Sequence, residues 1–87
     1  MNGEWIRDPV VMHTEIEREA VLLDPRTRRM FDLNRTGTVV WESIDEGIDA
    51  AIMRVVAVFE IDEASARNDV ESLLRQLAEA GLVSRRA

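Results

Sequence analysis

The sequence predicts an α+β domain in which a three-stranded antiparallel sheet precedes three helices. Between residues 10 and 33, short β-branched or apolar runs alternate with turn signals, which is typical of strands joined by tight turns. Between residues 36 and 80, apolar side chains recur at helical spacing, with glycines at 47 and 81 where helices would end. A length of 87 residues with 46% hydrophobic content fits one small domain.

Three strands are expected in the N-terminal half. Residues 10–16 are rich in β-branched side chains, and residues 17–18 would form a turn whose type is unclear because it lacks Gly and Asn. Residues 20–23 form a continuous apolar run, as expected of a central strand covered on both faces. After a turn that contains Pro25, residues 28–33 alternate with period two. A meander of these strands leaves one edge of the third strand unpaired.

Three helices are expected in the C-terminal half. The first covers about residues 36–45 and would be capped by Asn34 or Thr36. The second and third cover about residues 49–59, with Asp49 as a candidate N-cap, and 62–80. The apolar stripe of the third helix contains Val70, Leu73, Leu74 and Leu77. The order of sheet and helices is winged-helix-like, with the sheet moved to the front.

The two ends of the chain lack a clear pattern. Residues 1–9 are expected to form a partly ordered arm in which Trp5 covers apolar surface. Residues 10–83 form the predicted domain, in which Leu82 and Val83 pack back on the core. Residues 84–87 are expected to be frayed.

Composition excludes several classes of function. The sequence contains no cysteine, which excludes disulfides, thiolate chemistry and cysteine zinc sites. A net charge of −6 argues against a nucleic-acid surface. No apolar run reaches the roughly 18–20 residues of a membrane span, and no signal-peptide pattern is present. We therefore expect a cytoplasmic protein that binds neither membrane nor nucleic acid.

The residues offer no catalytic or metal site. His13 is the only histidine, and it is expected at the surface of a strand without neighbouring ligands. Glu42, Asp45 and Glu46 fit a solvated helix face, and the glycines form no phosphate loop. Four arginines cluster around the third strand, either solvated or available to a partner's carboxylate: Arg26, Arg28, Arg29 and Arg35. We expect no catalytic residue, metal or cofactor, so the protein is predicted not to be an enzyme.

The free strand edge predicts peptide binding. An extended peptide can add to an unpaired edge through backbone hydrogen bonds, while neighbouring apolar pockets select its side chains. The third helix has the length and the leucine-rich face to form the other wall of such a groove.

Over residues 10–83 the sequence resembles the PqqD-like peptide recognition elements of pathways that modify ribosomally made peptides. The resemblance depends on the order and spacing of Leu33-Asn34, Thr36-Gly37, Trp41, Asp69-Val70, Leu73-Leu74, Leu77 and Gly81-Leu82-Val83. It implies that the third strand and third helix hold the leader of a precursor peptide, antiparallel to the strand. It also implies that the protein presents this peptide to a processing enzyme and does no chemistry itself.

Within this family, a stand-alone acidic chain is similar to the leader-binding proteins of lasso-peptide biosynthesis. There the partners are the precursor peptide, a separate cysteine protease and an ATP-dependent cyclase. The alternative is a PqqD-type chaperone for a radical SAM enzyme in pyrroloquinoline quinone synthesis. Such proteins show a cysteine and tyrosines that this sequence lacks, so we favour the lasso branch. A winged-helix DNA-binding protein and a homodimer paired through the strand edge are further alternatives.

The resemblance implies a peptide-binding site on the third strand and third helix. Its candidate residues are Arg28, Arg29, Met30, Phe31, Asp32, Leu33, Arg67, Asp69, Val70, Leu73, Leu74, Leu77 and Ala78. Among them, Phe31, Leu33, Leu73 and Leu77 are expected to face the core. Leu74, Val70 and Met30 are expected to contact the peptide, since methionine adapts well to peptide surfaces.

Overall fold

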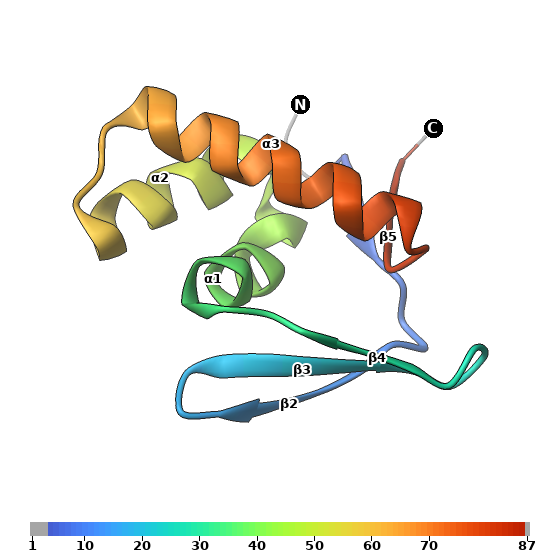
Figure 1. Ribbon diagram of the computed structural model, residues 1–87. Helices are drawn as coiled ribbons and strands as arrows, with labels where there is room; N and C mark the ends of the chain where they lie inside the picture. The colour runs from blue at the N-terminus through green and yellow to red at the C-terminus, as the bar shows by residue number, and fades with distance from the viewer. Residues whose placement is uncertain (1–3, 87) are drawn as a thin grey trace.

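The computed structural model describes residues 4–86, which form two small antiparallel sheets and three α-helices (Figure 1). The larger sheet contains β2 (Met12–Ile16), β3 (Glu19–Asp24) and β4 (Arg29–Asp32), in that order across the sheet. The predicted α+β class, with a three-stranded meander before three helices, is confirmed.

The turn between β2 and β3 consists of Glu17 and Arg18, with φ values of 52° and 69°. Two consecutive residues with positive φ are typical of a type I′ hairpin turn, which suits the twist of the flanking strands. The turn was hard to classify from the sequence because neither residue is one of those that usually occupy this conformation.

β3 is the central strand, but only one of its faces is covered. Ala20, Leu22 and Asp24 are buried, whereas Val21 and Leu23 are half-buried. The prediction of a strand covered on both faces is therefore wrong. Met12 and Met30 lie opposite Leu23 on the neighbouring strands, so the outer face is shielded only by its own neighbours. An apolar run cannot reveal this difference.

The helices are α1 (Arg35–Ser43), α2 (Ile48–Phe59) and α3 (Glu63–Glu79), with a short 3₁₀ turn, η1 (Ile44–Glu46), after α1. Asn34 caps α1 by accepting the Gly37 N–H at 2.8 Å, and Asp62 caps α3 in the same way. The prediction of Asp49 as a cap is wrong. Gly47 precedes α2 with φ 108°, so Asp49 lies in the first turn of that helix.

The ends of the chain form a second sheet that the sequence did not predict. β1 (Trp5–Arg7) pairs antiparallel with β5 (Val83–Arg85), with Trp5 opposite Arg85. The prediction of a frayed tail is therefore wrong for Ser84 and Arg85, which belong to β5. The predicted partly ordered arm contains a strand, and its Trp5 packs against the core, as expected. Strands this short carry no periodicity, and their partners lie at opposite ends of the sequence. Residues 1–3 and 87, which belong to the same predictions, lie outside the described residues.

The core lies between β3 and the helices. Leu22, Trp41, Ile52 and Leu74 contribute from one element each, and the predicted return of Leu82 and Val83 is confirmed because both are buried. His13 is exposed on the edge strand β2, as expected. Over residues 4–86, no helix combines the length and apolar character needed to cross a membrane.

Two carboxylates meet where β2 passes α1. Desolvation, together with the hydrogen bond and negative charge of Glu15, raises the pKa of Glu42 above 4.5. A raised carboxyl pKa contributes stability below the unfolded pKa, and this contribution is lost as the pH rises through the folded pKa. At pH 7 the charged pair therefore opposes folding.

We expect Glu42→Gln to raise the free energy of unfolding at pH 7 by about 0.5 kcal/mol, since the site is exposed and screened. The gain should shrink at pH 4, where the carboxyl group takes up a proton. Urea unfolding at both pH values measures it, with the exposed Glu71→Gln on α3 as the control. An equal gain at both pH values would contradict the assigned cause.

Candidate functional site

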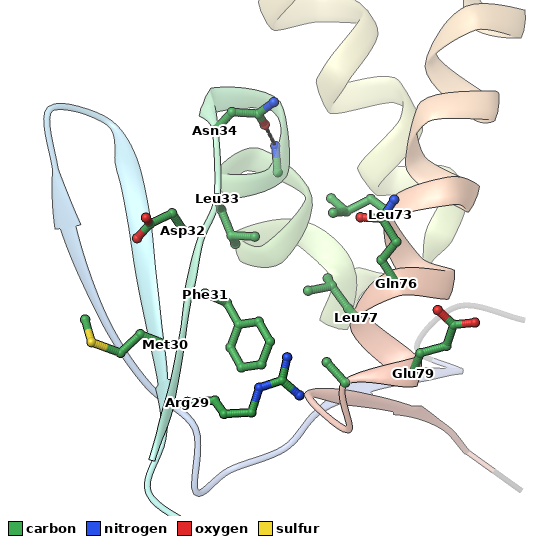
Figure 2. Close-up of a pocket in the computed structure, with 12 residues that line it drawn as sticks. Arg29, Met30, Phe31, Asp32, Leu33, Asn34, Leu73, Gln76, Leu77 and Glu79 are labelled. Atoms are coloured by element: carbon green, nitrogen blue, oxygen red, sulfur yellow. Dashed lines mark hydrogen bonds between the residues drawn. The ribbon is translucent and has the colours of Figure 1, made fainter. Parts of the chain in front are cut away.

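A groove of about 730 Å³ lies between β4 and α3 (Figure 2). One wall is β4, at one edge of the larger sheet, and the other is the C-terminal half of α3. The groove is lined by Arg29, Met30, Phe31, Asp32, Leu33, Asn34, Gly37, Leu73, Gln76, Leu77, Glu79 and Ala80. The two predicted elements therefore form the two walls of one groove.

The side chains of β4 alternate between the groove and the outer face of the sheet. Figure 2 shows Phe31 and Leu33 directed from β4 toward the helices, whereas Met30 and Asp32 are directed away. This follows from the pleat, which sends successive side chains to opposite faces. Met30 is 67% exposed and faces the outer side of the sheet, so only its backbone borders the groove.

The hydrogen-bond pattern shows which backbone groups of β4 are free. Leu33 N–H donates to the carbonyl of Ala20 at 2.8 Å, one position beyond the Val21–Asp32 pair that ends the ladder of β3 and β4. Because neighbouring residues of an antiparallel strand direct their N–H and C=O groups to alternate sides, Phe31 and Arg29 also bond inward. Met30 and Asp32 then point their backbone groups to the free edge, where no other strand of residues 4–86 lies beside β4.

The helix wall is made by one side of the apolar stripe of α3. Leu73 is half-buried and Leu77 is 4% exposed, and both border the groove. Val70 and Leu74 are 0% and 1% exposed and belong to the core. Val70 and Leu74, which were expected to contact the peptide, therefore do not line the groove, whereas Leu73, which was expected in the core, packs against the core and also lines the groove. A stripe about 100° wide does not reveal which of its two margins turns toward the sheet.

Charged groups stand at the end of the groove where β4 begins. The guanidinium of Arg29 lies 4.9 Å from the centre of the Phe31 ring, a cation–π distance. Glu79 lines the opposite wall. Arg28 has φ 61° in the preceding turn and does not border the groove.

The remaining predicted residues fall into two groups. Asp69 lines a smaller cavity of about 320 Å³ that continues the groove past Asn34 and Gly37. Arg67 and Ala78 border a different cavity, beside Trp5 on the other side of α3, so they are not brought together with β4.

Sequence reasoning missed five lining residues: Asn34, Gly37, Gln76, Glu79 and Ala80. The last three lie three to seven positions after Leu73, on the same side of the helix, and could have been found from that spacing. Gly37 leaves space at the junction of the two cavities. A Cβ at this position would lie 3.3 Å from both Leu33 Cβ and Asn34 Oδ1, which is tighter than normal packing.

The groove is suited to binding an extended chain. It combines free backbone donors and acceptors with an apolar floor, and it is open along its length. Within residues 4–86, no cluster of three or more histidines, cysteines or carboxylates could hold a metal ion. The arrangement therefore supports recognition of a peptide backbone and a few apolar side chains.

Comparison with known proteins gives one family and one fold. Residues 19–83 match the profile of a family described as "Coenzyme PQQ synthesis protein D (PqqD)". No curated protein sequence matches the chain. The fold is similar to that of "TbiB1 in Complex with the TbiA(beta) Leader Peptide", with 26% identity, a TM-score of 0.83 and coverage of 93% of this chain and 96% of that one.

A second solved structure has the same fold. It is described as "Lasso peptide synthetase B1 complexed with the leader peptide" and shares 22% identity, with a TM-score of 0.81. The alignment covers 93% of this chain and 98% of that one. The matched family region contains β3, β4 and all three helices, and therefore both walls of the groove.

Proposed function

We propose, because this chain belongs to the PqqD family, that it is a binding module for the leader segment of a ribosomally made precursor peptide. The observation that carries the proposal is the free edge of β4 beside an apolar helix wall. The two similar structures were both solved with leader peptides, which supports the same role here.

The leader adds to β4 as a fourth strand. Its backbone bonds to the outward groups of Met30 and Asp32, and its apolar side chains enter the groove against Phe31, Leu73 and Leu77. The protein itself catalyses no reaction. It works in the cytoplasm, where ribosomal precursors are made, and presents the bound peptide to a separate processing protease and to a cyclase.

The family description favours a second candidate, a PqqD-type chaperone in pyrroloquinoline quinone synthesis. The two candidates differ in the peptide that binds. A lasso-type protein binds the leader of a lasso precursor, whereas the alternative binds the precursor of the quinone. Titration with both peptides separates them.

We expect the cognate leader to bind with a dissociation constant on the order of 10 nM to 10 μM. About four backbone hydrogen bonds at roughly 1 kcal/mol each and two or three apolar anchors at about 1.5–3 kcal/mol each favour binding. An association cost of at least several kcal/mol opposes it. Since backbone bonds carry no net charge, the effect of salt should be modest.

The test is a calorimetric titration with the synthetic leader of a lasso-type precursor peptide. A scrambled peptide of the same composition is the control, because it keeps charge and hydrophobicity but changes the order of the anchors. Binding in the millimolar range, or equal binding of both peptides, would contradict the proposed function.

A further inference from the structure

The two walls of the groove are attached to different parts of the protein. β4 packs on β3, whereas α3 packs on α2, α1 and β5. β4 and α3 do not pack closely on each other, so the width of the groove depends on ties at its two ends. At one end, the chain leaves β4 through Leu33 directly into α1, which contacts α3. The other end, at Arg29 and Ala80, needs a separate tie.

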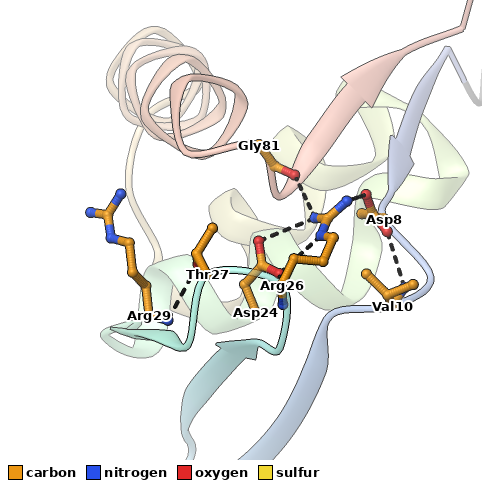
Figure 3. A network of polar contacts seen from close by, with 7 residues as sticks. All are labelled: Asp8, Val10, Asp24, Arg26, Thr27, Arg29 and Gly81. Atoms are coloured by element: carbon orange, nitrogen blue, oxygen red, sulfur yellow. Dashed lines mark hydrogen bonds and ion pairs between the residues drawn. The ribbon is translucent and has the colours of Figure 1, made fainter.

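Arg26 provides this tie (Figure 3). Its Nε and Nη2 donate to the two carboxylate oxygens of Asp24 at 2.9 and 3.1 Å, which is a bidentate arrangement. Asp24 is only 3% exposed and lies opposite Arg29 in the strand register. The carbonyl of Asp24 also accepts the Arg28 N–H at 2.7 Å. Arg26 is therefore fixed to the residues where β4 begins.

The same guanidinium reaches the end of α3 by two routes. Nη2 lies 3.4 Å from the carbonyl of Gly81, the residue after the groove residue Ala80. Nη1 donates to Asp8 Oδ2 at 2.8 Å, and Asp8 N–H donates to the carbonyl of Leu82 at 2.9 Å. One side chain thus connects the start of the strand wall with the end of the helix wall (Figure 3).

The opposite charges of Arg26 and Asp24 strengthen the contact between them. The hydrogen bond from Arg26 is the main reason why the pKa of Asp24 is lowered, so the pair remains ionised at neutral pH. The bonds from Arg26 to both carboxylates also raise the pKa of its guanidinium. A lysine could not reproduce this contact, because a single ammonium group lacks the planar fork that spans both oxygens of Asp24.

We propose that Arg26 is a positioning residue, which holds the start of β4 and the end of α3 at the separation that peptide binding requires. Arg26 is not among the residues that line the groove. The inference rests on the proposed function for its consequence in binding. The separation of the walls can be measured without any peptide.

The experiment measures the separation directly by electron–electron double resonance. Because the sequence contains no cysteine, Met30→Cys and Ala78→Cys place two spin labels cleanly, one on each wall. Both side chains are exposed, and neither points into the groove. The distance distribution is recorded in this background for Arg26→Ala, Arg26→Lys and Asp8→Ser, and peptide affinity is titrated in the corresponding single variants.

Arg26→Ala should broaden and lengthen the distribution and raise the dissociation constant at least tenfold. Arg26→Lys should give an intermediate result. Asp8→Ser should raise the dissociation constant about threefold, because serine still accepts the Val10 N–H of the turn but is too short to reach Arg26. The control is Arg54→Ala, which removes an exposed ion pair with Glu46 away from the groove and should change neither quantity.

An unchanged distance distribution in folded Arg26→Ala overturns the proposal, and so does an affinity within twofold of the wild type. If Arg26→Ala does not fold, the distance distribution and peptide affinity of Asp8→Ser test the proposal instead. This variant leaves the Asp24–Arg26 pair intact. If the wild-type protein binds no leader, the proposed function fails, and the distance measurement alone decides whether Arg26 positions the walls.

Discussion

Met30→Pro is expected to leave the protein folded while weakening leader binding at least tenfold, whereas Phe31→Pro is expected to prevent folding. The N–H of Met30 points to the free edge of β4, so proline removes a donor that only the peptide would use. The proline ring also occupies the space of the incoming strand. A lost hydrogen bond of about 1 kcal/mol and this clash together account for a tenfold effect.

Phe31 differs because its backbone bonds inward to Leu22 of β3. Proline there breaks the sheet and removes a half-buried aromatic side chain, with an expected cost of about 3–5 kcal/mol. Circular dichroism and a titration with the leader measure the two effects. Met30→Ala is the matched control, since it keeps the N–H and changes only a side chain on the outer face.

The outcome tests strand addition itself. If Met30→Pro is folded and binds the leader as the wild type does, the peptide does not add to β4. The site would then be confined to the α3 side of the groove. If Met30→Ala weakens binding as much as Met30→Pro, the outer face of the sheet takes part, and the assigned role of the backbone is wrong.

Leu74→Glu and Leu73→Glu are expected to fail in opposite ways, although the residues are adjacent. Leu74 is 1% exposed in the core, where truncation alone costs about 2–5 kcal/mol and a buried unpaired charge costs more. We expect this variant not to fold. Leu73 is half-buried on the groove wall, so its carboxylate can remain in water while it excludes an apolar side chain of the leader.

For Leu73→Glu we expect a protein that folds with a modest loss of stability and binds the leader at least thirtyfold more weakly. Thermal unfolding by circular dichroism and calorimetric titration separate stability from affinity. Ala78→Glu is the control, because it adds the same charge to α3 at an exposed position that borders a different cavity. Normal binding by folded Leu73→Glu would remove the residue from the site.

These neighbouring leucines show what the sequence can and cannot predict about the site. Helical spacing identified the apolar stripe of α3, and the alternation of residues 28–33 identified the strand opposite it. Both elements do line the groove. Helical spacing shows which side of α3 is apolar, but it does not show which edge of that side is buried. The structure therefore places Leu74 in the core and Leu73 at the groove, the reverse of what the sequence predicted. Tertiary contacts with α1 and α2 decide which margin is buried.

In the fold, too, features that depend on nearby residues could be predicted better than contacts between residues far apart in the sequence. The cap at Asn34 depends on residues within a few positions, and the sequence offered it as one of two candidates. The pairing of β1 with β5 depends on contacts between the two ends of the chain and leaves no local pattern. The contacts of Arg26 with Asp8 and Gly81 were unpredictable for the same reason.

The pairing of β1 with β5 also determines how the protein responds to mechanical force. Trp5 and Arg85, the outermost residues of this pair, lie side by side, so tension applied to the two ends acts across the strands. The hydrogen bonds would then open one after another, as in a zipper, rather than all at once. Opening would proceed to Arg7 and Val83 and next meet the Asp8–Leu82 bond and the Arg26 network. Tension on the two ends would therefore be resisted by the Asp8–Leu82 bond and the Arg26 network before it acted on β4 or α3.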